Sequence, residues 1–420
     1  MTAIYFVSSL DLVSLIVLFW YTVLLDIPRY TISAVIVACI TLLERPRQIQ
    51  KVSLRLSVLL VGHNEEHCLR TCVTSLWEQT ICSAPGAMQV IAVDDGSTDR
   101  MAEVAYRLQT EGKIHHVFRL HQRGGKSAGV NLAIDVADGD IIIIADIDTT
   151  FDRDAFETII GYFNDPSVGA VSGNLGVRNA SANLITRHQA IEYGIGISLG
   201  RRIMDALGIL TIVSGAFGAF RRVALEEVGR QDVEVGEDAD LTMKLRRAGW
   251  RVRFAADARG LTDVPTTLSG LTAQRLRWDR GLITIWSRKF RNALDPGRAS
   301  FRPADAFAIA DVLLFQIALA LTFPIYIVWL LYYFGSFGLT IIAVTLVVYA
   351  GLDALSFFTA AAVGMGPSLR LLAYVPFYSA MQVSIMRLIR LVAIIQELIF
   401  RSSYRDPYVP ERVMQTVEQV

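Results

Sequence analysis

Cysteine and net charge are both scarce in this sequence. It has four cysteines in 420 residues, and 40 lysines and arginines balance 40 aspartates and glutamates. A formally neutral chain is not a globally basic nucleic-acid binder, so we expect no nucleic-acid partner. Cys39 lies in an apolar segment, and Cys68, Cys72 and Cys82 lack the paired spacing of a zinc site. We therefore expect free thiols, with neither a disulfide nor zinc.

The sequence also lacks the signatures of two common nucleotide-binding sites. Its glycines do not fit the dinucleotide fingerprint G-x-G-x-x-G, and no G-x-x-x-x-G-K-[ST] loop is present. Neither a nicotinamide cofactor nor a P-loop ATPase is therefore indicated. Recognition of an anionic substrate has to come from local clusters of charged side chains.

Apolar residues, in contrast, are abundant and unevenly placed. They make up 53% of the sequence, and a membrane-spanning helix needs about 20 mostly apolar residues. The first apolar run has no basic segment before it and no small-residue cleavage site after it, so we expect it to be retained. The sequence predicts an integral membrane protein, with apolar runs at 3–25, 32–43, 304–334, 339–363 and 371–400.

These runs divide the chain into five parts. Basic residues flank both edges of the long polar region, which predicts a cytoplasmic domain in a multi-pass protein of the plasma or inner membrane. Trp286 and the cations around it would anchor an interface helix at the lipid headgroups. The expected parts are two membrane helices in 1–44, the cytoplasmic domain in 45–281, an amphipathic interface helix in 282–303, about three membrane helices in 304–400 and a polar tail in 401–420.

The last apolar run carries charges that allow two interpretations. Arg387 and Arg390 interrupt it, and a charge at mid-membrane costs roughly 2.5–3.5 kcal/mol. Either a long, tilted helix lines a polar conduit with these arginines, or the span ends near Met386 and residues 387–400 lie along the membrane surface. The sequence leaves both open.

The cytoplasmic domain alternates strands with helices. Apolar runs predict strands at 56–61, 88–93, 116–119 and 140–145, and helical spacing follows the first two. Continuous apolar strands that alternate with helices are typical of a parallel sheet covered on both faces. The fold class is therefore α/β.

Polar residues follow three of these strands, and in open α/β sheets ligands bind beyond the carboxyl ends of the strands. The groups are His63-Asn64-Glu65, Asp94-Asp95 and Asp146-Ile147-Asp148. Asp146 and Asp148 are two apart at the end of an extended run, so we expect their carboxylates to point the same way. A divalent cation with a preference for oxygen ligands, Mg²⁺ or Mn²⁺, would relieve their repulsion, whereas an isolated D-x-D is more often a solvated turn.

Two further groups could contribute to chemistry. Lys126 follows two glycines at the start of a predicted helix, where its charge and the helix amides would attract an anion. Glu237, Asp238 and Asp240 begin another helix. Acids in a first turn are commonly helix caps, yet a carboxylate near other negative charge also has the tuning of a general base.

The stretch TAQRLRWDRG, residues 272–281, gathers cations around one tryptophan near the membrane. If it is helical, Gln274, Arg277 and Trp278 share a face. Arg277 would grip phosphate oxygens and Trp278 offers a flat surface for a sugar ring, while the alternative is an interfacial anchor. On the solvated side of the same helix we expect Arg275, Asp279 and Arg280.

Taken in order, these motifs resemble the membrane-embedded, processive members of glycosyltransferase family 2, which synthesise cellulose, hyaluronan, chitooligosaccharide and poly-N-acetylglucosamine. The resemblance covers roughly residues 56–281. It implies a GT-A-type nucleotide-sugar-binding domain with a mixed, mostly parallel sheet, flanked by transmembrane helices. The motifs are VGHNEE, VDDGSTD, GKSAGVN, ADIDTT, VSGAFGAFRR, VGED and QRLRW.

The resemblance assigns a role in donor binding to several of these residues. His63, Glu65, Asp94 and Asp95 would form the nucleoside pocket, and Lys126 would lie beside the donor. Many relatives have P-x-Y-N-E where this chain has VGHNE, so any stacking on the base would be by an imidazole. Asp146 and Asp148 would hold Mg²⁺ or Mn²⁺ and the donor diphosphate, and Arg277 would bind the departing diphosphate.

The same resemblance implies an acceptor site. Asp238 would be the general base that deprotonates the acceptor hydroxyl in an inverting displacement. Ser214 and Gly215 would form the floor under the acceptor, and Gln274 and Trp278, with Arg277, match the signature of processive enzymes.

The implied function is an inverting, processive β-glycosyltransferase that uses a UDP-sugar and passes its polysaccharide into or across the bilayer. GED with QRLRW is most similar to the N-acetylglucosamine polymerases, because cellulose synthases usually carry TED, so UDP-N-acetylglucosamine is the expected donor. Alternatives are a hyaluronan or glucan synthase, a single-addition transferase acting on a lipid, and a transport or scaffold protein that only binds a nucleotide sugar. An accessory export protein is a partner that the resemblance allows.

Overall fold

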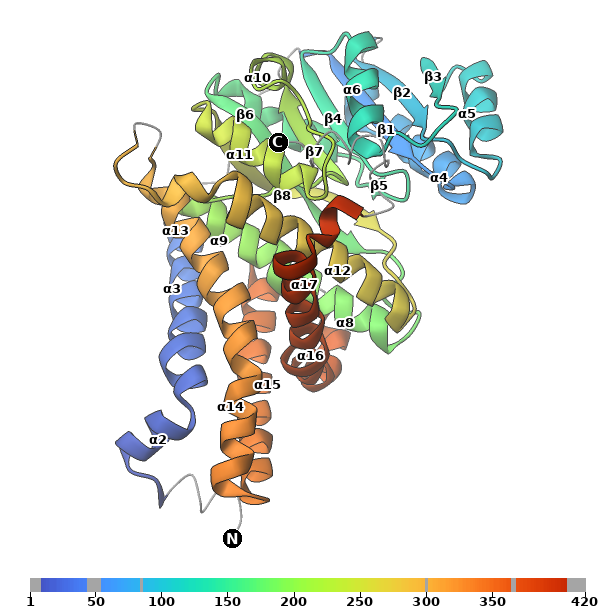
Figure 1. The fold of residues 1–420 in the computed structure, drawn as a ribbon. Coiled ribbons are helices and arrows are strands. Elements are labelled where there is room, and N and C mark those ends of the chain that lie inside the picture. Colours follow the sequence, from blue (N-terminus) through green and yellow to red (C-terminus); the bar gives the residue numbers. More distant parts are fainter. Residues whose placement is uncertain (1–8, 44–53, 84–85, 299–300, 364–367, 406–420) are drawn as a thin grey trace.

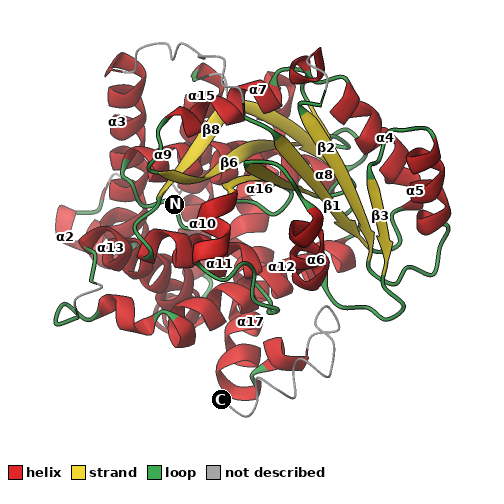
Figure 2. Cartoon of the chain, turned by 90° about the horizontal axis from the view of Figure 1, so that it is seen from above, coloured by secondary structure: helices red, strands yellow, loops and turns green. Residues whose placement is uncertain are grey.

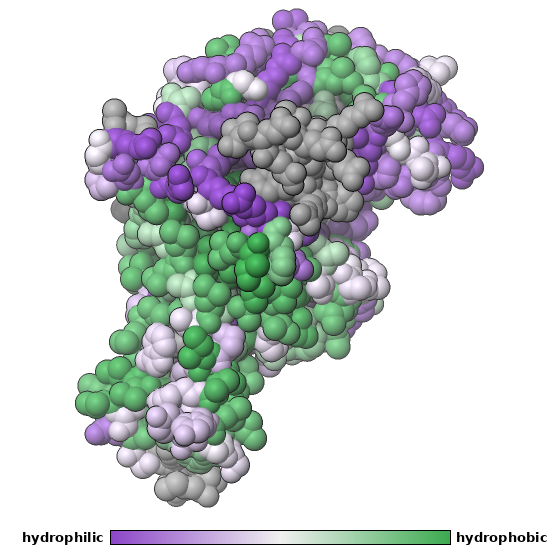
Figure 3. Space-filling view, in the orientation of Figure 1, coloured by the Kyte–Doolittle hydropathy of each residue, from purple (hydrophilic) through white to green (hydrophobic). Residues whose placement is uncertain are grey.

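The structure is a computed structural model that describes residues 9–43, 54–83, 86–298, 301–363 and 368–405. It consists of a head built around a β-sheet and a stalk of long helices (Figure 1). The surface of the head is largely hydrophilic, whereas the stalk carries a broad hydrophobic surface (Figure 3).

One eight-stranded sheet forms the centre of the head, in the order β3-β2-β1-β4-β7-β6-β8-β5. Neighbours from β3 to β4 are parallel, as are β6 and β8, whereas β7 is antiparallel to β4 and β6. The mixed, mostly parallel sheet is thus confirmed. The strands are β1 (Leu56–Gly62), β2 (Met88–Asp94), β3 (His116–Arg119), β4 (Ile141–Ala145), β5 (Thr150–Phe151), β6 (Val168–Val177), β7 (Phe217–Arg221) and β8 (Arg251–Thr262).

Helices cover both faces of the sheet (Figure 2). Side chains alternate along β1, so Val58 and Leu60 pack with α4, α5 and α7, while Leu59 and Val61 pack with α6, α10 and α11. This explains the continuous apolar strands in the sequence. The helices are α4 (Glu66–Trp77), α5 (Met101–Thr110), α6 (Lys126–Val136), α7 (Ala155–Ile160), α10 (Arg222–Glu227) and α11 (Glu237–Arg247), with the 3-10 turns η2 (Thr80–Ser83) and η3 (Gly161–Asn164).

A layer of helices lies between the head and the stalk (Figure 1). Its first part begins with a capping box, in which Asn183 and Thr186 each accept a hydrogen bond from the other's backbone N–H at 3.0 Å. Thr267 caps the second part by accepting from the Gly270 N–H at 3.1 Å. The segments are α8 (Leu184–Glu192), η4 (Tyr193–Leu199) and α9 (Gly200–Ala206), followed later by α12 (Leu268–Thr284), η5 (Ile285–Lys289) and η6 (Arg291–Leu294).

Residues 282–303 differ from the expected interface helix. Helix α12 continues through their first part into η5, and Trp286 is 1% exposed in a core with Met243 and Phe290. Lys289 contacts carboxylates of the head, including Asp240 at 2.6 Å. Trp286 and Lys289, interpreted as headgroup anchors, therefore make contacts within the protein, and Arg288 likewise contacts Glu397 of the last helical segment at 2.6 Å.

Two helices among the described residues are long and apolar enough to cross a membrane, residues 303–334 and α15 (Phe337–Ala362). The first comprises α13 (Pro303–Asp311), η7 (Val312–Ala318) and α14 (Leu319–Phe334). The N-terminal region contains α2 (Leu12–Leu18), η1 (Tyr21–Asp26) and α3 (Ile27–Leu43), and a 96° bend follows α2. It therefore offers one broken candidate span where two were expected. Residues 1–8 and 44, like most of the predicted tail, lie outside the described residues.

The last apolar run folds as η8 (Leu369–Tyr374), α16 (Val375–Met381), η9 (Gln382–Met386), α17 (Arg387–Phe400) and the short turn η10 (Ser402–Arg405). Arg390 Nε lies 3.3 Å from Asp279 of α12, and Arg387 Nη2 lies 4.0 Å from Asp26. Both arginines face protein, which supports a charged interior over a helix lying along the membrane surface.

Gly173 tests the packing of the sheet. A Cβ at this position would lie 2.0 Å from Cδ1 of Phe217 on the adjacent strand. We expect Gly173→Ala to destabilise the protein by about 1–3 kcal/mol through overpacking, measured by thermal unfolding in detergent. Gly351→Ala is the matched control, because no heavy atom lies within 4 Å of the added Cβ. Equal melting temperatures for the two variants would contradict the described packing.

Candidate active site

The sheet brings the three polar groups to one edge, as predicted. Gly62 pairs with Asp94 between β1 and β2, and Leu60 pairs with Ala145 between β1 and β4. Because these strands are parallel and in this register, the residues that follow them meet at the same end of the sheet.

Asp94 and Asp95 are occupied by backbone amides. Asp94 Oδ1 accepts from the Ser97 N–H at 2.9 Å, and the two Asp95 oxygens accept from the N–H groups of Gly124 and Gly125 at 2.6 and 3.0 Å. Both side chains are nearly completely buried. Asp95 thus holds the loop before α6 and takes amides that were expected to attract a substrate anion.

His63 and Glu65 follow β1 at the same edge of the sheet and have different surroundings. His63 Nδ1 lies 3.0 Å from the carbonyl oxygen of Asp95, which fixes the imidazole next to the buried carboxylate loop. Burial, followed by repulsion from Asp148 and Asp146, raises the pKa of Glu65 to about 7. Glu65 therefore interacts with the D-x-D carboxylates and does not form part of a surface on which a base could stack.

The D-x-D segment forms a turn directly after β4 and does not extend the strand. The Thr149 N–H donates to the Asp146 carbonyl at 3.1 Å and closes the turn. Asp146 Oδ1 then contacts Lys126 Nζ at 2.5 Å, while Asp148 Oδ1 accepts from the Thr262 hydroxyl at 3.1 Å. Burial and the charge of Asp146 nevertheless raise the pKa of Asp148 to about 6.

These carboxylates fit a divalent cation. Asp146, Asp148 and Glu65 lie close enough for their charges to interact, and burial followed by this repulsion raises the pKa values of Glu65 and Asp148. Hard oxygen ligands with excess negative charge are the donor set that Mg²⁺ and Mn²⁺ prefer.

Lys126 connects the D-x-D turn with α11. Its Nζ donates to Asp146 and, at 3.1 Å, to the carbonyl of Gly215. Burial alone would lower the pKa of Lys126, but Asp146, Asp238 and Glu237 raise it above its usual value. The ammonium is therefore a permanent cation between two groups of acids.

Asp238 lies in the first turn of α11, after Gly236 in a left-handed conformation with φ +91°. Its Oδ2 accepts from the Gly215 N–H at 2.8 Å. Burial and the neighbouring Glu237 raise its pKa to about 7, which suits a general base. A Cβ on Gly215 would lie 2.5 Å from Asp238 Oδ1, so this carboxylate requires glycine there.

Helix α12 carries the remaining predicted residues. Trp278 is 37% exposed, and Arg277 and Gln274 are half-buried on the same helix. A Cβ on Gly281, three residues beyond Trp278, would lie 3.1 Å from the backbone of Gly236, so α12 touches the start of α11. The prediction that Arg275 and Asp279 lie on a solvated side of this helix is wrong. They are 7% and 8% exposed, because Arg275 contacts Glu192 and Asp279 contacts Arg390.

The sequence did not reveal other parts of this site. Ser214 is 8% exposed, and its backbone N–H donates to the Ser172 hydroxyl at 3.3 Å. That hydroxyl also accepts from Arg201 at 3.2 Å. Burial lowers the pKa of Arg201 to about 10, against an opposing effect of Asp238. No local motif marks Ser172 or Arg201, since only the fold brings β6 and α9 to Ser214.

The sheet and the clustered acids define a glycosyltransferase domain of GT-A type. Residues 57–229 match the family model Glycosyl transferase family 2.

Curated relatives agree with this assignment. The chain is 32% identical over 212 residues to a poly-beta-1,6-N-acetyl-D-glucosamine synthase of Staphylococcus aureus, which covers 50% of this chain and 51% of the relative. It is 30% identical over 250 residues to the synthase of the same name in Staphylococcus epidermidis, or 58% of each chain. The chain thus spans little more than half the length of the curated relatives it matches.

A solved structure shows the same fold. The mannosyltransferase PcManGT from Pyrobaculum calidifontis, in complex with GDP-Man and Mn²⁺, superposes with a TM-score of 0.61 over 89% of this chain and 96% of its own, at 20% identity. The likeness therefore includes helices outside the family 2 domain.

Asp148 allows a test of the excess negative charge. The pKa of Asp148 is higher in the folded protein than in the unfolded chain, so its ionisation destabilises the fold. This destabilisation grows as the pH rises and is complete above about 6. It is absent at a pH low enough to protonate the carboxyl in both the folded and the unfolded protein. With a chelator present, we expect Asp148→Asn to stabilise the protein by about 2 kcal/mol more at pH 8 than at pH 3, measured by thermal unfolding. The exposed Asp138→Asn is the control, and a destabilised Asp148→Asn at pH 8 would contradict the charge balance.

Proposed function

We propose that the chain is an inverting, processive β-glycosyltransferase that polymerises N-acetylglucosamine from UDP-N-acetylglucosamine. The observation that carries this proposal is Asp238, a half-buried carboxylate with a pKa of about 7, held by the Gly215 N–H beside Lys126. A protein that only bound or transported a nucleotide sugar would not require a base tuned in this way. The names of the curated relatives support the choice of sugar.

The donor would bind along the carboxyl edge of the sheet. His63, Glu65, Asp94 and Asp95 surround the nucleoside end, with Asp94 and Asp95 acting through the loops that they hold. Asp146 and Asp148 would hold Mg²⁺ or Mn²⁺ at the donor diphosphate. When bound, such an ion supplies charge stabilisation for the leaving diphosphate.

The chain's own cations complete the donor site. The Lys126 ammonium, already fixed between Asp146 and Gly215, would neutralise one diphosphate oxygen. Arg277 on α12 would bind another through its guanidinium fork. Preorganised cations of this kind stabilise charge that develops as UDP departs.

The acceptor would meet the donor at Asp238. Its free Oδ1 would accept the proton of the acceptor hydroxyl while that oxygen attacks the anomeric carbon and the bond to UDP breaks on the opposite side. Ser214 and Gly215 form the floor beneath this point, and Gln274 and Trp278 would hold the sugar at the growing end. The product then has the inverted, β configuration.

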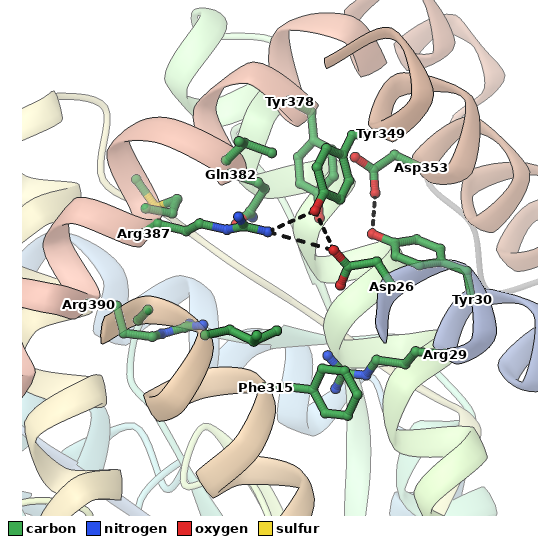
Figure 4. A pocket seen from close by; sticks show the side chains of 14 residues that line it. Asp26, Arg29, Tyr30, Phe315, Tyr349, Asp353, Tyr378, Gln382, Arg387 and Arg390 are labelled. Carbon is green, nitrogen blue, oxygen red and sulfur yellow. Dashed lines mark hydrogen bonds and ion pairs between the residues drawn. The ribbon is translucent and has the colours of Figure 1, made fainter. Parts of the chain in front are cut away.

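A cavity in the stalk is a candidate entrance for the growing chain into the membrane. It measures about 170 Å³ and is lined by polar side chains of α3, α15, η9 and α17 (Figure 4). Tyr30 donates to Asp353 at 2.7 Å, and Tyr349 donates to Asp26. Arg390 joins its wall to Asp279 of α12, the residue after Trp278. A hydroxyl-rich product fits such a lining, and an accessory protein could continue the path.

Asp238→Asn tests the assignment of the base. We expect release of UDP from UDP-N-acetylglucosamine and Mn²⁺ to fall by about 10²–10⁴-fold, because asparagine keeps the shape of the side chain but cannot accept the proton. The control is Asp138→Asn, an exposed aspartate before the opposite end of β4. Equal UDP release by both variants would remove the catalytic assignment of Asp238.

The pH dependence gives an independent test. Because Asp238 works only when ionised and its pKa is about 7, we expect kcat to rise about tenfold per pH unit below that value and to level off above it. Glu237 contributes to the raised pKa, so Glu237→Gln should move the midpoint to lower pH. The measurement is kcat from pH 5 to 9 at saturating donor and Mn²⁺. A profile that Glu237→Gln leaves unmoved would contradict this account.

A further inference from the structure

The first arginine of Q-R-L-R-W has no part in the reaction described above, yet it is one of the most enclosed cations of the site. Arg275 is 7% exposed, whereas the adjacent Trp278 is 37% exposed. A long charged side chain is rarely buried without specific partners. Its burial beside an aromatic side chain assigned to the acceptor therefore calls for a function.

Arg275 lies between the carboxylate of Glu192 on α8 and the indole of Trp278 on its own helix, α12. Its Nη2 contacts Glu192 Oε2 of α8 at 2.5 Å. Its Cζ lies over the ring of Trp278, 4.1 Å from the ring centroid. The guanidinium thus covers one face of the indole, while a substantial part of that side chain stays accessible.

This arrangement restrains the indole. Arg275 and Trp278 are three residues apart on α12 and so lie on the same side of the helix. Glu192 comes from a different helix and fixes the guanidinium against rotation, and burial strengthens both contacts. His188, one turn earlier on α8, adds no competing charge, because burial lowers its pKa to about 4.

We propose that Arg275, held by Glu192, is a positioning residue that closes one face of Trp278 and presents the other face to the terminal sugar of the acceptor. The ligand of that free face is an uncharged pyranose, whose C–H groups pack on an aromatic surface. This inference rests on the proposed function, since it assigns Trp278 to the acceptor. Arg275 itself touches neither substrate.

Kinetics of three single variants test the positioning role. Glu192→Gln and Arg275→Met should raise the KM for a short β-linked N-acetylglucosamine oligosaccharide about tenfold, the scale of a buried cation–π contact. The KM for UDP-N-acetylglucosamine and the rate of donor hydrolysis without acceptor should stay unchanged. Arg275→Lys should recover most of the loss, because an ammonium keeps both the charge and the contact with the ring.

A double variant separates positioning from a general loss of structure. If Glu192 acts through Trp278, then Glu192→Gln should have no further effect on the acceptor KM in a Trp278→Ala background. The matched control is Arg187→Met, because Arg187 also lies on α8 and stacks on an aromatic ring, Tyr374, at 4.6 Å. A full effect of Glu192→Gln without Trp278, or an equal effect of Arg187→Met, would overturn the inference.

A readout without catalysis distinguishes failure of this inference from failure of the proposed function. The emission of Trp278 is obtained as the difference between the native protein and Trp278→Phe. Acrylamide should quench this emission more strongly in Glu192→Gln and Arg275→Met, because the indole is then more accessible. Unchanged quenching would overturn the positioning role even in an active enzyme. Increased quenching in a protein that releases no UDP would support the restraint on Trp278 and reject the proposed reaction.

Discussion

A single ammonium group, that of Lys126, lies between the acids that the sheet gathers at its edge. It contacts Asp146 on one side and the Gly215 carbonyl on the other, and Asp238 is bound to the N–H of the same Gly215. The D-x-D turn and Asp238 are therefore joined through one lysine and one peptide unit. Displacing either would move the proposed metal ligands and the proposed base together.

The acids of the site fall into two groups with different tasks. Asp94 and Asp95 accept hydrogen bonds from backbone amides, pair with Arg119 and Arg123, and hold the loops in place. Asp148, Glu65 and Asp238 have raised pKa values because burial and mutual repulsion are not fully compensated. The first group stabilises the fold, and the second stores unfavourable charge that a cation or a proton from the substrate would relieve. This is the general pattern of a functional site.

Local patterns in the sequence were sufficient for the four parallel strands β1 to β4 and for the start of α11. The apolar run at 116–119 coincides with β3, and the acids at 237–240 do begin a helix. Other features depend on partners far along the chain. That Asp95 takes the amides before α6, that Arg275 meets Glu192 and that Trp286 enters a core could not be predicted from neighbouring residues. The membrane part was harder still, because an apolar run gives the length of a segment but not where it bends.

Helix α12 connects the head with the stalk. It touches the start of α11 at Gly236 and contacts Arg390 of α17 through Asp279, the residue after Trp278. Under the proposed function, this connection would serve a polymerase, which has to pass its product from the base toward the stalk.

The size of the product tests this central claim most directly. Membranes containing the protein would be incubated with labelled UDP-N-acetylglucosamine and Mn²⁺, and the products separated by length, with other UDP-sugars in parallel. The account predicts long chains of N-acetylglucosamine even early in the reaction, when most acceptors are still unused. Products one sugar longer than a lipid acceptor, or chains made only from a different UDP-sugar, would contradict it.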